Sequence, residues 1–265
     1  MTTASLYRAL IWRARREGYA LIFAYPLLTT VIVGAAMVFA AHDPSLANVP
    51  AVPVSGQFGV TTHDARMALA VASAPMLLML GTALGGGRCV QSLVGAEATN
   101  GAVELWLADG LDAADVVRAV WYAIATAVGA IWAATTVLVC AALGAVALLL
   151  GTGVHPTASY AALLLLAPLV LALAGTLMAV GLAFARPRLV QASERGIARG
   201  TGNVVGTLAA APGFAVTVLV IVGSDHGTSA GALTACAAAL TVVFAVIGAV
   251  LARWATRREE LVGSQ

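Results

Sequence analysis

The chain has 265 residues, of which 61% are apolar and only 10% are charged, and its formal net charge is +2. Soluble domains carry about 25% charged residues, so this composition excludes an ordinary water-soluble globular domain, and lipid is the expected solvent for most of the chain. All 14 basic residues are arginine, and without a lysine the chain cannot supply the phosphate-binding residue of a Walker A loop, which excludes a standard P-loop ATPase.

Residues 1–18 combine leucines and Trp12 with a cluster of arginines. This pattern predicts an amphipathic helix in the cytoplasmic membrane interface, where tryptophan is a common anchor. A plain positive flank that fixes the topology is the alternative, and the two interpretations are compatible. The apolar run that follows is longer than the core of a signal peptide, so we expect a retained first helix.

Six apolar runs follow, each long enough to cross a hydrocarbon core, which takes about 20 residues. They lie at residues 19–41, 65–84, 116–150, 156–184, 203–223 and 231–252. The third run is too long for a simple span, and we expect its helix to extend beyond the membrane. The pattern predicts an all-α polytopic membrane protein, with a six-helix transmembrane domain over 19–252 and a cytoplasmic tail over 253–265.

Thirteen of the 14 arginines lie on one side of this arrangement. Only Arg66 lies on the other side, one turn inside the second run, where it can snorkel to headgroups. Positive charge marks the cytoplasmic side, so both termini are expected in the cytoplasm. The lack of lysine and the abundance of alanine suggest a GC-rich bacterial genome, so the expected location is the bacterial cytoplasmic (inner) membrane.

The six runs hold no ionisable residue at mid-membrane depth, which argues against a carrier driven by protons or sodium. Four prolines interrupt them: Pro26, Pro75, Pro168 and Pro212. Each favours a kink, and Pro212-Gly213 is the strongest break. Kinks at Pro75, Pro212 and Gly213 suit a moving pathway, although proline also shapes ordinary packing in membrane helices.

Small residues at four-residue spacing mark the fifth run, at Gly202, Gly206 and Ala210. Such a stripe predicts close helix packing. A contact between two subunits and packing within the chain are equally open interpretations.

The stretch between the second and third runs, residues 94–115, reads VGAEATNGAVELWLADGLDAAD. Asn100 as an N-cap and Gly110 as a C-cap predict a short helix between them. Its apolar face would hold Val103, Trp106 and Leu107. Asp112 is expected to cap the next helix, with Asp115 at the capping-box position.

This segment resembles the signature of the ABC-2 type permeases of ATP-binding-cassette transporters, which has the form E-R-x-x-G-T-L-E-x-L-L-x-x-P-L. The matching residues are Glu97, Gly101, Glu104, Leu107 and Leu111. The differing residues are Ala98, Ala102, Val103, Trp106 and Gly110. The length, the amphipathic N-terminal segment and the six runs with cytoplasmic ends are also similar to the family.

The resemblance implies that residues 97–111 form a coupling helix that docks on a cytosolic ATP-binding subunit. The residues implied at this contact are Glu97, Gly101, Glu104, Trp106, Leu107 and Leu111. A loop helix that rests on lipid headgroups is the alternative for this segment.

For the whole chain, the resemblance implies a permease subunit that exports an apolar or amphipathic small molecule, such as a drug, an antibiotic or a lipid. It would pair with a second copy or a similar permease and bind two ATP-binding subunits, which would hold ATP and magnesium, so no cofactor and no nucleic acid are expected on this chain. The alternatives are a non-transporting scaffold or sensor, or a haem-exporter-like permease subunit.

All four histidines lie in predicted outer loops, at His42, His63, His155 and His226. Three have an aspartate neighbour, and imidazole with carboxylate suits zinc or copper. No pair has the spacing of a known site, so solvated loop polarity is the favoured interpretation and no metal ligand is assigned.

Overall fold

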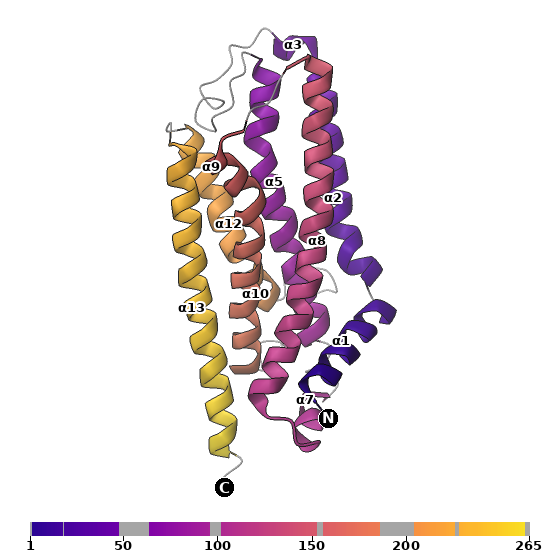
Figure 1. The fold of residues 1–265 in the computed structure, drawn as a ribbon, viewed down its shortest axis with the longest axis vertical. Helices are drawn as coiled ribbons and strands as arrows, with labels where there is room; N and C mark the ends of the chain where they lie inside the picture. Colours follow the sequence, from indigo (N-terminus) through magenta and orange to yellow (C-terminus); the bar gives the residue numbers. More distant parts are fainter. Residues whose placement is uncertain are drawn as a thin grey trace.

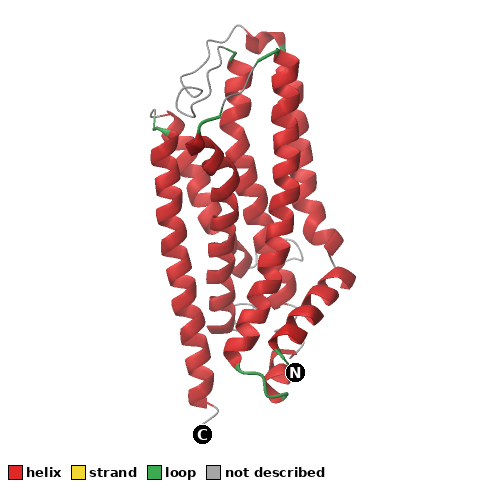
Figure 2. Cartoon of the chain, viewed as in Figure 1, coloured by secondary structure: helices red, strands yellow, loops and turns green. Residues whose placement is uncertain are grey.

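The computed structural model describes residues 2–17, 19–47, 64–95, 102–152, 156–185, 204–225 and 228–262, and these residues form helices joined by short turns, without a strand (Figures 1 and 2). The α-helices are α1 (Thr3–Glu17), α2 (Tyr19–Ala41), α3 (Pro44–Ala47), α5 (Ala65–Val90), α7 (Ala102–Ala108), α8 (Ala113–Leu150), α9 (Ala158–Ala161), α10 (Ala167–Ala185), α12 (Val204–Asp225) and α13 (Ala230–Val262). Two π-helical segments, η1 (Gln91–Gly95) and η2 (Ala162–Leu166), continue α5 and precede α10.

Four helical stretches are long and apolar enough to cross a membrane, which indicates a membrane protein. They are Ala65–Val90, Ala113–Leu150, Ala158–Ala185 and Gly231–Trp254. The two other predicted spans coincide with α2 and α12, whose described apolar stretches are shorter, at Pro26–Ala41 and Gly206–Leu219. The all-helical architecture is confirmed, while the number of six spans stays a prediction.

The helices differ in how far they are enclosed by the rest of the bundle. In the apolar windows of Ala65–Val90 (α5) and Ala158–Ala185 (α9 to α10), 61% and 67% of the residues are buried, whereas in Ala113–Leu150 (α8) and Gly231–Trp254 (α13) the shares are 22% and 11%. A helix that is apolar on all sides needs lipid or protein around it. Thus α5 and α10 form the centre of the bundle, and α8 and α13 present wide apolar faces outward.

Two helices, α8 and α13, are longer than a membrane span requires. At 1.5 Å rise per residue, the 38 residues of α8 extend for about 57 Å, nearly twice the thickness of a hydrocarbon core of about 30 Å. The expected extension of the third run beyond the membrane therefore has a helical form. The last helix, α13, continues past the predicted span at 231–252 to Val262, so most of the predicted cytoplasmic tail is helical.

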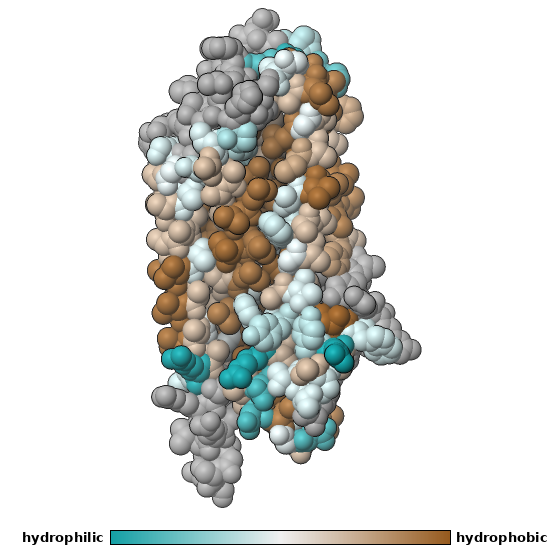
Figure 3. All heavy atoms as spheres, in the orientation of Figure 1, coloured by the Kyte–Doolittle hydropathy of each residue, from teal (hydrophilic) through white to brown (hydrophobic). Residues whose placement is uncertain are grey.

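The polar residues gather at the ends of the bundle. In Figure 3 a hydrophobic band crosses the middle of the visible face, and the most hydrophilic residues lie at the lower end. Helix α1, helix α7 and the C-terminal end of α13 all lie at that end (Figure 1). The exposed arginines Arg8, Arg88, Arg118 and Arg253 belong to helix segments that end or begin there. Both ends of the chain therefore lie at the same, basic end of the bundle.

Helix α1 packs on protein with its apolar side. Leu6 and Leu10 are 1% and 2% exposed and join a core cluster with residues of α8 and η1. The hydroxyls of Tyr7 and Thr126 lie 3.1 Å apart and link α1 to α8. Trp12, in contrast, is 62% exposed. The leucines predicted to meet lipid are thus covered by the bundle, whereas the predicted interface role of Trp12 stays a prediction.

At the opposite end, Arg66 joins α5 to α2. Its guanidinium donates to both carboxylate oxygens of Asp64, at 3.1 and 2.8 Å, and to the backbone oxygen of Ala41 at 2.9 Å. Asp64 also caps α5 by accepting from the backbone N–H of Arg66. Hydrogen bonding to Arg66 holds the pKa of Asp64 below its ordinary value. Arg66, which sequence analysis directed toward headgroups, has intramolecular partners and ties two helices together.

Candidate functional site

Helix α7 and the start of α8 form a corner at the basic end. Gly110 has a φ of +80°, which residues with a side chain rarely adopt, and its N–H bonds the backbone oxygen of Leu107 at 3.0 Å. The chain then turns into α8 at Asp112, whose extended backbone marks the N-cap position. The side chain of Asp112 makes no capping bond, and Asp115 pairs with Arg118 at 3.3 Å. The corner therefore forms without the side-chain capping contact expected of Asp112.

Two of the predicted coupling residues on α7 face the bundle. Trp106 and Leu107 pack against the core cluster that contains Leu6 and Leu10, and Leu111 is itself a buried member at 7% exposure. This contact fixes the orientation of α7 on α8 and α1. The apolar face predicted for Trp106 and Leu107 is therefore the attachment of α7 to the molecule.

The opposite face of α7 carries a residue that sequence analysis did not single out. Leu105 is 67% exposed, and Ala108 and Asp109 beside it are exposed as well. The signature leaves this position unspecified, so no motif signal identifies it; only the inward packing of Trp106 and Leu107 shows that Leu105 must point out. A contact made by α7 with another protein would include Leu105.

The structure does not describe the side chains of the remaining predicted coupling residues. Glu97 and Gly101 lie outside the described residues. Glu104 lies within α7, and its side chain is outside the described part of the structure. Their roles stay predictions.

Close packing of α5 on α12 explains the small residues on the fifth run. A Cβ on Gly87 would lie 2.6 Å from the backbone oxygen of Gly206, and a Cβ on Gly206 would lie 2.6 Å from Nε2 of Gln91. Ala210, one turn further along α12, is 2% exposed. Gly206 and Ala210 therefore pack within the chain, while Gly202 lies outside the described residues.

The residues predicted to kink the helices are buried where the helices pack against one another. Pro75 is buried inside α5, and Pro212 is buried inside α12. At Gly213 a Cβ would approach Cβ of Ala83 on α5 to 2.6 Å, and Pro212 lies against Gly175 of α10. Pro212-Gly213 thus marks the point where α12 meets two neighbouring helices, and a role in a moving pathway stays a prediction.

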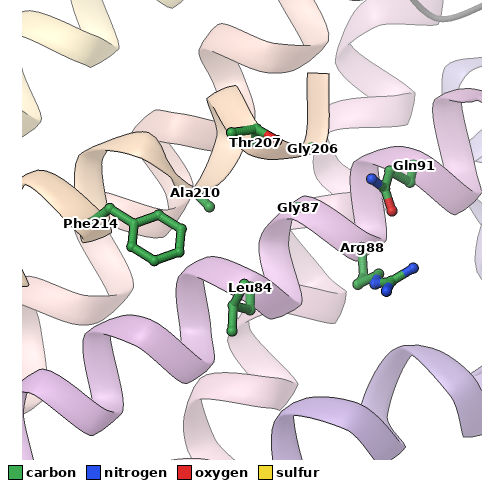
Figure 4. A pocket seen from close by; sticks show the side chains of 8 residues that line it. All are labelled: Leu84, Gly87, Arg88, Gln91, Gly206, Thr207, Ala210 and Phe214. Carbon is green, nitrogen blue, oxygen red and sulfur yellow. The ribbon is translucent and has the colours of Figure 1, made fainter. Parts of the chain in front are cut away.

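A groove of about 280 Å³ opens beside this contact (Figure 4). Its lining residues are Leu84, Gly87, Arg88 and Gln91 of α5 and η1, with Gly206, Thr207, Ala210 and Phe214 of α12. Arg88 and Gln91 lie at one end of this group and Phe214 at the other. The groove is therefore polar toward the basic end of the bundle and apolar toward its middle.

Within the described residues, the fully buried polar side chains include four threonines and Tyr160, whose hydroxyl donates to the backbone oxygen of Val71 at 2.9 Å. Thr30, Thr82, Thr135 and Thr176 each donate to a backbone oxygen of their own helix. Such bonds satisfy the hydroxyls without a second helix. The described interior thus offers a neutral surface, which suits an uncharged or singly charged molecule better than a highly charged one.

The histidines predicted in outer loops give no assembled metal site in the described part of the chain. His42 makes a contact of 2.9 Å between its Nδ1 and the backbone oxygen of Val38, one turn earlier in α2. The other three, His63, His155 and His226, lie outside the described residues. No group of three or more possible ligands is present among the residues that the structure describes.

Comparisons with models of known protein families, with curated proteins and with solved structures find no match to this chain. The functional argument therefore depends on the residues and their arrangement.

Proposed function

We propose that this chain is the membrane-spanning subunit of an ATP-driven exporter. In this proposal six helices cross the bacterial cytoplasmic membrane, with both termini in the cytoplasm. The observation that carries it is the corner formed by α7 and α8. A short helix is joined to α8 by a turn at Gly110, packs inward through Trp106 and Leu107, and lies at the basic end of the bundle. The position of exposed arginines at this end supports a cytoplasmic location for it.

The proposed partner is a cytosolic ATP-binding subunit, two copies of which would bind a pair of permease chains. Helix α7 would enter a cleft on that subunit with Leu105 and Ala108 outward, and movement of the cleft would be passed through the corner to α8. A short helix that packs on a long one can pass motion to it through the side chains they share, here Trp106 and Leu107. The likeness of residues 97–111 to the ABC-2 signature supports this assignment.

The proposed cargo is apolar or amphipathic. The support is the neutral interior of the described helices and the groove between α5 and α12, whose lining is apolar toward the middle of the bundle. A highly charged molecule would lose its hydration without gaining a charged partner there. Energy for export would come from the partner, since the chain has no lysine for a Walker A loop.

The test is purification from the native membrane, followed by reconstitution with any Walker A protein that is captured. We expect the two proteins to co-purify and ATP hydrolysis to depend on that partner, with none from this chain alone. Gly101→Trp should block docking sterically, and Glu104→Arg should replace an attractive contact with repulsion, at a cost of about 1–3 kcal/mol if that contact is partly buried.

Both variants should insert in the membrane at normal levels, while partner capture and export fall together. Full export and normal capture in both variants would contradict a coupling role for this segment. ATP hydrolysis by the purified chain itself would contradict the assignment of the energy source.

A further inference from the structure

Pro75 removes one hydrogen bond from the backbone ladder of α5. Proline has no backbone N–H, so Pro75 cannot donate to the backbone oxygen of Val71, which lies four residues earlier in the same helix. Both residues are buried, and a buried backbone oxygen that lacks a donor costs free energy. A donor from another part of the chain therefore stabilises α5 at this point.

Tyr160 supplies this donor. Its hydroxyl donates to the backbone oxygen of Val71 at 2.9 Å, and its side chain is 2% exposed. Tyr160 and Val71 belong to one core cluster, in which the segment formed by α9 and η2 packs on α5. The bond takes the place of the one that Pro75 cannot make, and it joins the break in α5 to a segment far away in the sequence.

The segment that carries Tyr160 is itself irregular. Helix α9 is a single turn, Ala158–Ala161, and η2 continues it as a π-helix over Ala162–Leu166. Single π-helical turns are rare and occur frequently at functional sites. The indole Nε1 of Trp132 on α8 donates to the backbone oxygen of Leu165 at 2.8 Å. Since α8 begins at the corner with α7, one continuous helix connects that corner with the segment that holds Tyr160.

The two parts of α5 on either side of Pro75 are held by different helices. Kinks in helices occur at proline because the hydrogen-bond ladder is interrupted there. Arg66 bonds the first part of α5 to α2, and Gly87 in the last part packs on α12. A change of the angle between the two parts would move Val71 relative to the hydroxyl of Tyr160. The angle of α5 and this bond are therefore coupled.

We propose that the bond from Tyr160 to Val71 is a releasable latch on the bend of α5 at Pro75, and that α8 controls the latch through Trp132. With the bond made, α5 keeps the angle that the structure shows. With the bond broken, α5 changes its angle at Pro75 while both of its ends remain packed. The inference goes beyond the proposed function, because it concerns the helices of this chain alone and requires no ATP-binding partner.

The experiment measures hydrogen–deuterium exchange of the full chain in nanodiscs, read by mass spectrometry on a peptide that contains Pro75. Tyr160→Phe removes only the hydroxyl. We expect exchange in this peptide to become about 2- to 10-fold faster, because one intramolecular hydrogen bond is lost, while peptides of α13 keep their rates. Tyr122→Phe is the matched control, since Tyr122 is 53% exposed on α8, and it should leave the rate of the Pro75 peptide unchanged.

A second substitution tests whether the bond acts through Pro75. Pro75→Ala restores the N–H that donates to Val71 in a regular helix, so Tyr160→Phe should no longer accelerate exchange in the Pro75→Ala background. The difference between the two backgrounds measures the coupling of the two residues. Equal increases in both backgrounds, or no increase in either, overturn the latch. Faster exchange in all helices of Tyr160→Phe also overturns it, because that result is expected of a residue that only stabilises the fold.

Trp132→Phe tests the part played by α8. It keeps an aromatic ring but removes the donor to Leu165, so exchange in the Pro75 peptide should become faster, as in Tyr160→Phe. An unchanged rate overturns the control by α8. All these measurements use this chain without a partner, so their outcome is independent of the exporter proposal.

Discussion

Replacing the exposed Leu105 by alanine tests whether α7 docks on a partner, without removing the contacts that attach α7 to the rest of the chain. Full burial of a leucine side chain is worth about 1.5–3 kcal/mol. Because 67% of Leu105 is exposed in the chain, about two thirds of that value, or about 1–2 kcal/mol, is available to a partner that covers it. This free energy corresponds to an increase of about 5- to 30-fold in the Kd for the ATP-binding subunit.

The assay is a titration of the ATP-binding subunit against the chain in nanodiscs, read by biolayer interferometry. Leu148→Ala serves as the matched control, because Leu148 is 84% exposed near the opposite end of α8 and should leave the Kd unchanged. Leu107→Ala should instead lower the thermal unfolding temperature, since Leu107 packs on the core cluster. An unchanged Kd in Leu105→Ala, or the same increase in Leu148→Ala, refutes the reasoning that α7 docks through its outward face.

Three further predictions concern topology, acid stability and helix packing. A cysteine at Gln57 should react with a membrane-impermeant thiol reagent in intact cells and one at Ser193 should not, since thirteen of 14 arginines lie on one side; the reverse labelling would overturn the orientation. Asp64→Asn should lower the unfolding temperature at pH 7. The stabilisation from Asp64 is present above its ordinary pKa of 3.8 and is lost as pH falls through the lower pKa of the folded state. The unfolding temperatures of the variant and the unchanged chain should therefore converge at more acid pH. A difference in unfolding temperature that stays constant with pH would exclude this cause. Gly87→Ala should destabilise the chain by about 1–3 kcal/mol through overpacking, because its Cβ would meet a backbone oxygen at 2.6 Å. The matched change Gly129→Ala, which has open space around the added Cβ, should be neutral or stabilising, and equal thermal shifts in the two variants would contradict the close approach of α5 and α12.

Hydropathy and capping residues predict much of this fold because they act locally. Apolar runs locate the long helices, and Gly110 locates the end of α7 since few other residues adopt its φ. Hydropathy does not locate the end of α13, because arginines and glutamates are good helix formers and the helix continues through them to Val262.

The hydropathy of each apolar run does not predict contacts between segments that are far apart in the sequence. The leucines of α1 could meet lipid or protein by composition alone, and only the position of α8 shows that Leu6 and Leu10 are covered. Arg66 likewise requires the end of α2 nearby before its bond to Ala41 can be expected. The exposure of Leu105 follows from the packing of its two neighbours, and the groove follows from where α12 crosses α5; neither has a signature in the sequence.

The bonds of Arg66 have a consequence for how the bundle can move. These bonds join α2 and α5 at the end opposite α7. A rotation between the two helices with this end as its pivot would displace them more with distance from it. At 1.5 Å per residue, the 26 residues of α5 reach about 39 Å from this pivot, so a rotation of about 5° would shift the far end by roughly 3 Å. A small change of angle at the Arg66 end would thus become a displacement comparable to an atomic diameter at the mouth of the groove.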